Sequence, residues 1–373
     1  MKLFIYLAKI LAAKIIEKNT QITIKDIATK AKVSIGTVDR VLHNRGEVAE
    51  NTRRKINEII KEFDYQPNIL ARALASKKTV VFSTLFPEPL SPEGYWNKPM
   101  LGVKKRISEL NQYGIKTENF TFRQSDPKDF AVQSEKILEL KPDGVVLAPF
   151  FSKEACRFVN ILNDRKIPFV FLDSEIKNAG QISFVGQNSY QSGYLAGKLM
   201  DLTAPAHKQI LVIHFAKEMD NQNHLTQREA GFHHWFSFRH PEKPIKTFEI
   251  GNMDNRDWET GILCEIENKN TGGIFVTNSK VFLVARFLEN RNINNISVIG
   301  YDLLRENKKF LKQGAVSFLI CQRPEEQGYN AVNMLFKHIV QKKQVRMEDY
   351  TPIDIITKEN VDFYKEFKIE RTT

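Results

Sequence analysis

Polar and aromatic side chains follow several short apolar runs of this chain, at the point where each run ends. Asp173 comes directly after residues 169–172 (FVFL), and Asp302 comes directly after residues 298–301 (VIGY). Carboxylates accept paired hydrogen bonds from vicinal hydroxyl groups, and aromatic rings cover the apolar faces of sugar rings. The residues therefore predict a site for a neutral, polyhydroxylated small molecule. Those that end such a run are Glu88, Phe150, Asp173, Asn278 and Asp302.

The apolar runs themselves have the character of buried strands. About nine of them alternate with helical stretches from residue 80 onward, which is typical of parallel sheets covered on both faces. Since that is too many strands for one compact sheet of this kind, two doubly wound lobes fit better. Ligands of open parallel sheets bind beyond the carboxyl ends of the strands, so we expect these polar residues to meet in one cleft between the lobes.

Each of these residues also has an interpretation that involves no ligand or a different chemistry. Asp173, Asn278 and Asp302 could instead be strand-end caps or turn formers, although ligand binding is the favoured interpretation. Two cleft carboxylates could hydrolyse glycosides, but this needs one raised pKa and a suitable separation. GxSxG and GxGxxG motifs are absent, and Leu199 stands where a phosphate loop needs a hydroxyl. We therefore expect no enzymatic activity, no catalytic residues and no cofactor.

Basic charge is concentrated at the start of the chain. Residues 1–79 hold 16 Lys and Arg against 8 Asp and Glu, whereas the other 294 residues hold 39 against 36. This imbalance is typical of a nucleic-acid-binding module joined to a neutral one, although a solvated basic face would give the same numbers. The three cysteines are far apart and the eight histidines have no metal-ligand spacing, so we expect neither disulfides nor metal.

Residues 22–76 favour the nucleic-acid interpretation. Apolar side chains recur at helical spacing in three short stretches, and a fourth helical stretch follows Pro67. Lys32 and Val33 form the predicted turn, and Ser34 is a good N-cap for the second helix. Two helices that cross at such a turn expose the start of the second one, which is the geometry that lays a helix in the DNA major groove.

The same stretch resembles the DNA-binding headpiece of the lactose-repressor (LacI/GalR) family. The matches are Thr23-Ile24-x-Asp26-Ile27-Ala28, Ala31-x-Val33-Ser34, Thr37-Val38-x-Arg40-Val41-Leu42, Thr52-Arg53, Tyr65-x-Pro67-Asn68, Ala71 and Leu74-Ala75. A purely structural three-helix bundle is the alternative, but so many matches in one register are specific. The resemblance implies an all-α helix-turn-helix headpiece at residues 22–67 and a hinge helix or linker at residues 68–79.

The resemblance also implies the DNA contacts. In the family, the positions of Ile35, Gly36 and Arg40 choose the operator sequence; Ile35 can touch a thymine methyl, and Arg40 can bind guanine with two hydrogen bonds. Asp39 departs from the family's usual serine. Leu74 matches a leucine that wedges into the minor groove, the alternative being packing on the headpiece. The expected DNA-binding residues are Thr23, Ser34, Ile35, Gly36, Thr37, Asp39, Arg40, His43, Arg53, Asn68, Ala71 and Leu74.

Residues 80–373 resemble the type I periplasmic sugar-binding fold, which the family uses as its effector domain. This implies an α/β two-lobed domain, with lobe 1 at 80–186 plus 322–350 and lobe 2 at 187–321 plus 351–373. Arg228 resembles the effector-binding arginine of the family, with pairing to Glu229 as the alternative. The expected effector-binding residues are Glu88, Tyr95, Trp96, Phe150, Asp173, Arg228, Asn278, Asp302 and Gln322.

Together these expectations describe a transcription regulator whose operator affinity is controlled by a sugar-like effector. A repressor is the favoured form of such a regulator. Its partners would be a pseudo-palindromic duplex, the effector and a second copy of the chain, in the cytoplasm and without a membrane. Residues 1–21 are expected to form a helical extension, because Lys9 and Lys14 interrupt the apolar run of a leader peptide. The alternatives are a periplasmic-type sugar-binding protein and a corepressor-dependent regulator with a non-sugar ligand.

Overall fold

The computed structural model describes residues 22–42, 45–63, 65, 79–215, 223–251 and 257–365. The chain divides into two compact units, residues 1–76 and residues 77–373. The predicted N-terminal extension, nearly all of the predicted hinge segment, and His43, Asn68, Ala71 and Leu74 lie outside the described residues. The two units are described separately below.

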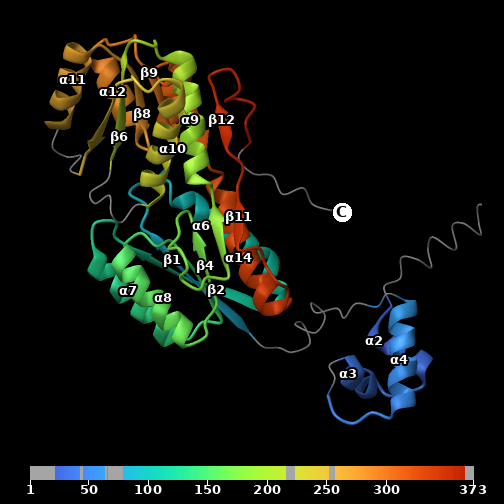
Figure 1. Cartoon of the computed structure of the whole chain (residues 1–373). Coiled ribbons are helices and arrows are strands. Elements are labelled where there is room, and N and C mark those ends of the chain that lie inside the picture. Colours follow the sequence, from blue (N-terminus) through green and yellow to red (C-terminus); the bar gives the residue numbers. More distant parts are fainter. Residues whose placement is uncertain are drawn as a thin grey trace, which may run out of the picture. The chain divides into compact units, whose positions relative to one another are not determined.

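The described part of the N-terminal unit contains three helices: α2 (Ile24–Ala31), α3 (Ile35–Leu42) and α4 (Glu50–Glu62) (Figure 1). The apolar side chains at helical spacing fill its core, among them Ile27, Val38 and Ile56. Lys32 ends α2 in the left-handed conformation with φ of 57°, and Ser34 Oγ accepts from Thr37 N at 3.1 Å. The predicted turn and the predicted N-cap are therefore confirmed.

The larger unit contains two six-stranded sheets. The first sheet has the order β11-β5-β4-β3-β1-β2, and all its neighbouring strands are parallel. Strands β3, β4 and β5 are buried along their whole length, which explains their uninterrupted apolar sequences. The strands of this sheet are β1 (Val80–Pro87), β2 (Ile115–Phe122), β3 (Gly144–Leu147), β4 (Phe169–Leu172), β5 (Ser183–Gly186) and β11 (Glu348–Tyr350).

The second sheet has the order β12-β10-β9-β8-β6-β7. Its strands are parallel except for β12, which runs antiparallel to β10. The predicted α/β architecture of two doubly wound parallel sheets is confirmed. The strands are β6 (Gln209–His214), β7 (Ile245–Glu249), β8 (Thr271–Val276), β9 (Ser297–Tyr301), β10 (Phe318–Cys321) and β12 (Asp354–Ile356).

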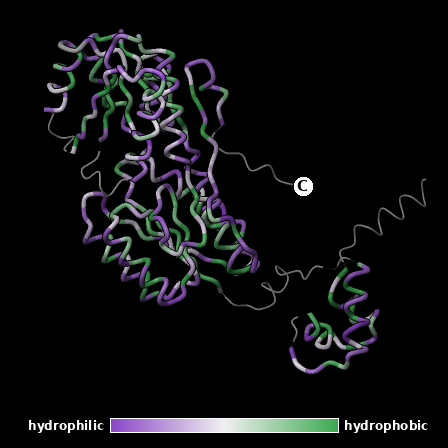
Figure 2. The backbone as a smooth tube through the Cα atoms, in the orientation of Figure 1, coloured by the Kyte–Doolittle hydropathy of each residue, from purple (hydrophilic) through white to green (hydrophobic). Residues whose placement is uncertain are grey.

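Helices cover both sheets, and we call the first sheet with α6, α7, α8 and α14 the first lobe, and the second sheet with α9 to α13 the second lobe (Figure 1). The pairs α6 with α14 and α9 with α10 pack along each other. In Figure 2 the hydrophobic stretches gather in the strands, as expected for sheets between helical layers. The helices are α6 (Asn97–Leu110), η1 (Asn111–Tyr113), α7 (Pro127–Leu140), α8 (Ser152–Asp164), α9 (Ser189–Thr203), α10 (Asn223–Arg239), α11 (Asp257–Lys269), α12 (Val281–Asn290), α13 (Arg305–Gln313), α14 (Pro324–Leu335) and η3 (Phe336–Val340).

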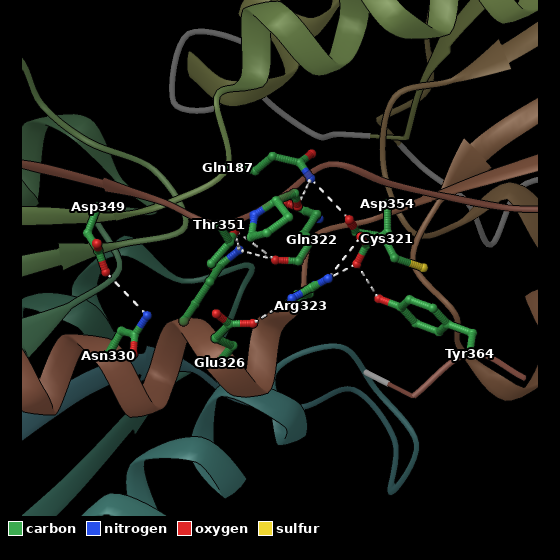
Figure 3. Close-up of polar contacts among 12 residues, drawn as sticks. Gln187, Cys321, Gln322, Arg323, Glu326, Asn330, Asp349, Thr351, Asp354 and Tyr364 are labelled. Atoms are coloured by element: carbon green, nitrogen blue, oxygen red, sulfur yellow. Dashed lines mark hydrogen bonds and ion pairs between the residues drawn. The ribbon is translucent and has the colours of Figure 1, made fainter. Parts of the chain in front are cut away.

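The chain passes between the two sheets after β5, after β10 and after β11. Hydrogen bonds tie these three crossings together (Figure 3). Gln187 Nε2 donates to the carbonyl oxygens of Cys321 at 3.0 Å and Pro352 at 3.2 Å. The Arg323 guanidinium donates to both Asp354 carboxylate oxygens, at 2.6 and 3.1 Å. Hydrogen bonds therefore hold the three crossings together. The residue limits predicted for each lobe stay a prediction.

Candidate effector cleft and DNA-reading helix

A cleft of about 1450 Å³ opens between the two lobes, and both contribute to its wall. All nine residues predicted to bind an effector lie in this wall: Glu88, Tyr95, Trp96, Phe150, Asp173, Arg228, Asn278, Asp302 and Gln322. They come from loops at the carboxyl ends of the strands and from α10, although up to 234 residues separate them in the sequence. The structure thus brings the predicted set together, while the role of each residue stays a prediction.

The first lobe contributes a carboxylate held by a phenol. Asp173 directly follows β4 in the left-handed conformation, with φ of 69°, and its backbone N donates to Val185 O at 3.0 Å. Tyr95 Oη donates to Asp173 Oδ1 at 2.6 Å. Burial, followed by the nearby charge of Asp173, raises the pKa of Tyr95 well above its usual range. The phenol therefore remains a donor, and the carboxylate keeps further lone pairs for a ligand.

The second lobe contributes a buried carboxyl–amide–guanidinium chain. Asp302 follows β9 with φ of 67°, and both of its carboxylate oxygens accept from Gln322 Nε2 at 3.1 Å. Gln322 Oε1 in turn accepts from Arg228 Nη2 at 2.6 Å. Arg228 is only 2% exposed and its guanidinium lies 3.8 Å from the centre of the Tyr301 ring. The three polar groups hold each other in fixed orientations at the cleft wall.

Arg228 does not pair with Glu229, which was the alternative left open by the sequence. Its Nη1 donates to Thr277 O at 2.7 Å. Glu229 instead binds His214 Nε2 at 2.9 Å, while His214 Nδ1 lies 2.7 Å from Thr277 Oγ1. The hydrogen bond to His214 is the main cause that lowers the pKa of Glu229. Glu229 thus belongs to a network behind the cleft, and Arg228 faces the cleft.

Asn278 and the aromatic residues have structural partners as well as a place in the cleft wall. Asn278 Nδ2 donates to Phe215 O at 3.0 Å, and its Oδ1 accepts from Lys280 N at 3.2 Å. This is the turn-forming role that the sequence also allowed. Trp96 packs edge-on against Tyr95 with 5.2 Å between ring centroids, and Phe150 packs on Phe151 at 5.2 Å.

His224 and Lys280 are among the cleft residues that the sequence interpretation missed. His224 lies in the first turn of α10, and its Nδ1 is buried without a hydrogen-bond partner in the described part of the chain. Burial lowers the pKa of His224 to about 4, so the ring is neutral at physiological pH. Lys280 precedes α12, and burial lowers its pKa to about 8. Neither follows a strand directly, so the strand-end rule could not find them.

The buried carboxyl of Asp302 predicts a pH-dependent stability. Burial is the main cause that raises its pKa to about 7, whereas an unfolded aspartate titrates near pH 4. Folding therefore takes up a proton between about pH 4 and 7, and stability falls as the pH rises through this window. Asp302→Asn removes the cost of the buried charge, which is at most roughly 4 kcal/mol above pH 7. We expect urea unfolding to show a growing stability advantage of the variant from pH 5 to pH 8; an advantage that stays constant would contradict the assignment.

The start of α3, which the sequence assigned to DNA binding, is exposed to solvent. Ile35 is 48% exposed, and Gly36 and Arg40 are exposed beside it. A Cβ added to Gly36 would meet Ser34 Oγ at 3.7 Å, an ordinary contact, so the fold of the unit does not require a glycine here. Thr23 and Ser34 cap α2 and α3, Thr37 and Asp39 are half-buried on α3, and Arg53 is half-buried on α4.

The described ranges contain no group of three or more His, Cys, Asp or Glu residues that could hold a metal ion. The same ranges contain no helix long and apolar enough to cross a bilayer.

Comparisons with known proteins agree with both units. The family model "Bacterial regulatory proteins, lacI family" matches residues 23–68, and the model "Periplasmic binding protein domain" matches residues 85–343. The HTH-type transcriptional regulator RegA of Clostridium acetobutylicum is 35% identical over 161 residues, which are 42% of this chain and 46% of that protein. The HTH-type transcriptional repressor PurR of Klebsiella pneumoniae is 26% identical over 86% of this chain and 92% of its own length.

A solved structure extends this comparison over the larger unit. The crystal structure of a Bacteroides fragilis protein, assigned as a LacI transcriptional regulator, is 32% identical with a TM-score of 0.71. The alignment covers 77% of this chain and 100% of that chain, whereas the alignment with RegA covers less than half of RegA. The chain therefore belongs to the lacI family of bacterial regulatory proteins, and its larger unit is a periplasmic binding protein domain.

Proposed function

We propose that this protein is a sequence-specific DNA-binding transcription regulator whose affinity for DNA is set by a small polyhydroxylated effector. The observation that carries the proposal is the presence, in one chain, of a helix-turn-helix unit with an exposed α3 and of a two-lobed ligand cleft. A solute-binding protein without a DNA role would leave the N-terminal unit without a purpose.

The DNA half rests on the surface of α3. Its buried face consists of Val38 and Val41, which pack on the other two helices, so its remaining face is free to enter a major groove. Arg40 offers the bidentate donor that suits guanine, and Ile35 offers an apolar contact for a thymine methyl. Because two such units are needed to read a two-fold site, we propose a homodimer, acting on genomic DNA in the cytoplasm.

The effector half rests on groups that suit hydroxyls. Asp173 and Asp302 accept, Arg228 donates, and the ring of Trp96 offers a flat apolar face. The raised pKa of Asp302 is also a property of a general acid in glycoside hydrolysis. Here, however, both of its oxygens are bound by Gln322, and the named relatives are regulators of transcription. The geometry therefore supports binding rather than turnover.

Gln322 provides a physical link between the cleft and the crossings. Its side chain contacts Asp302 and Arg228 in the cleft. Its backbone oxygen accepts from Thr351 Oγ1 at 2.9 Å (Figure 3) and also from Gln327 Nε2 at 2.9 Å. A ligand that draws Asp302 and Arg228 toward the first lobe must also pull on the segments that cross between the lobes, because Gln322 is bound to both. We propose that the effector thereby shifts the population between two lobe arrangements that differ in DNA affinity. Release and recruitment of DNA by the effector are both compatible with this link.

Arg40→Ala tests the DNA half. We expect it to weaken binding to a selected operator by about 10- to 100-fold, because a lost bidentate base contact costs roughly 1–3 kcal/mol. The operator is obtained by selection from genomic fragments with the full chain, and affinity is then measured by fluorescence anisotropy at several salt concentrations. Binding of the unmodified protein should fall steeply with salt.

Arg157→Ala is the matched control, since it removes the same charge from the exposed surface of α8. We expect it to leave operator affinity unchanged. Equal losses in both variants would show that net charge, rather than contact by α3, drives binding. Failure of the full chain to select any genomic fragment would refute the DNA half altogether.

A further inference from the structure

The cleft wall contains a cation, Lys280, that pairs with no carboxylate among the described residues. Lys280 lies between Asn278 and the start of α12, and it lines the cleft together with Ser279 and Phe282. We infer that the effector carries a carboxylate, which binds Lys280 at the N-terminus of α12, so that the ligand class is a sugar acid. The inference rests on the proposed function, because it specifies the ligand of the same cleft.

The first support is the unbalanced charge of Lys280. Its Nζ donates to the neutral carbonyl oxygen of Phe215 at 3.3 Å. Loss of hydration lowers its pKa, and no carboxylate among the described residues offsets that effect. A desolvated cation is costly unless an anion accompanies it, and a ligand can supply that anion.

The second support is the position of Lys280 on a helix. It is the residue that precedes α12, and its side chain does not cap the helix. The positive end of the helix dipole therefore adds to the lysine charge at the same wall of the cleft. The first-turn amide of Phe282 already donates to Asn307 Oδ1 at 3.1 Å, so a ligand carboxylate at this place would meet the ammonium group and the helix dipole rather than this amide.

The third support is a pair of buried nitrogens that lack partners. Among the described residues, Arg228 Nε and His224 Nδ1 have no hydrogen-bond partner, and both side chains line the cleft. The other two guanidinium nitrogens of Arg228 bind only neutral oxygens, those of Thr277 and Gln322. Leaving a buried donor unsatisfied costs free energy, so a ligand that brings additional acceptor oxygens is favoured.

The charged groups of the cleft wall together define the ligand. Asp173 and Asp302 repel an anion and bind hydroxyl groups, whereas Lys280 attracts an anion. The ligand must therefore present hydroxyls to the two carboxylates and a negative charge to Lys280, as uronic and aldonic acids do. A sugar phosphate shares the negative charge, but it would bring close to two charges to a single lysine. We therefore assign the monovalent carboxylate.

Thermal unfolding of the full chain with matched compounds tests the inference. The panel contains D-glucuronate, D-galacturonate and D-gluconate, their neutral counterparts D-glucose, D-galactose and sorbitol, and glucose 6-phosphate. A ligand that binds the native state raises the melting temperature. We expect at least one of the three acids to raise it more than its neutral counterpart and more than the phosphate. A panel in which no acid does so overturns the inference.

The acid with the largest effect is then titrated calorimetrically into two variants. Lys280→Met should raise its Kd by about 10-fold or more, because a charge-assisted hydrogen bond is lost, and should change the Kd of the neutral counterpart much less. Lys136→Met removes an exposed lysine from α7 and should leave both Kd values unchanged. An unchanged Kd for the acid in Lys280→Met also overturns the inference.

The same data separate this inference from the proposed function. If neutral sugars bind and Asp173→Asn prevents that binding, then the cleft is a sugar site and only the carboxylate assignment fails. If no compound changes the melting temperature and cleft variants leave DNA binding insensitive to all of them, then the effector half of the proposed function fails too.

Discussion

Replacing Asp173 with asparagine is expected to weaken effector binding by about 100-fold or more, while the ligand-free protein keeps its affinity for DNA. The carboxylate lies in the cleft wall and accepts one hydrogen bond from Tyr95, which leaves its other lone pairs for ligand hydroxyls. Each hydrogen bond to a charged group contributes about 1.5–3 kcal/mol, so the loss of two such bonds exceeds a hundredfold in affinity. Asparagine would also turn an amide donor toward the ligand.

The fold should survive this change, which makes the result interpretable. Asp173 occupies the left-handed region with φ of 69°, and asparagine is one of the few residues that tolerate this conformation. The amide oxygen can still accept from Tyr95. Asp164→Asn, at the exposed end of α8, removes the same charge away from the cleft and should change nothing. Calorimetric titration of the best sugar or sugar acid, with operator binding measured in parallel, checks the result; equal affinities in both variants would exclude Asp173 from the site.

The cleft was predictable because parallel strands end at a common edge. Asp173, Asn278 and Asp302 directly follow β4, β8 or β9 within two residues, so the strand-end rule found them without any alignment. His224 escaped because it lies in the first turn of α10, and Lys280 escaped because it lies four residues beyond the end of β8, next to the start of α12. The pairing of Glu229 with His214 was equally hidden, since adjacent residues on a helix point in different directions and only the packing decides which one meets the cleft.

The architecture was predictable where strands are fully buried, whereas three of the four edge strands gave no apolar run. Apolar runs identified β3, β4 and β8, which are buried on both faces. The edge strands β2, β7 and β11 were missed, because their alternating or exposed polar residues, such as those of Ile115–Phe122, form no apolar run. An edge strand has only one neighbouring strand and stays partly exposed to water, so its sequence contains fewer consecutive apolar residues.

Helices α9 and α10 pack against each other in close contact. A Cβ on Gly193 would lie 1.9 Å from the carbonyl oxygen of Arg228, and a Cβ on Gly231 would lie 2.0 Å from the carbonyl oxygen of Tyr190. The backbones of the two helices are thus in direct contact, and Gly193 of α9 packs against Arg228, the residue that faces the cleft. The glycine pattern at 193 and 197 therefore serves helix packing, which agrees with its poor match to a phosphate loop.

Gly193→Ala should therefore destabilise the larger unit by about 3 kcal/mol or more, because overpacking against backbone cannot be relieved by a side-chain rotation. Gly261→Ala on α11 is the matched control, since its Cβ would meet only Phe248 at 3.8 Å. An alanine there removes backbone freedom from the unfolded chain and should stabilise the unit by about 0.5–1 kcal/mol. Urea unfolding followed by circular dichroism measures both. If the two alanines shift the midpoint in the same direction, the backbone contact of α9 with α10 is not the constraint that positions Arg228, and the rigid support of the cleft must lie elsewhere.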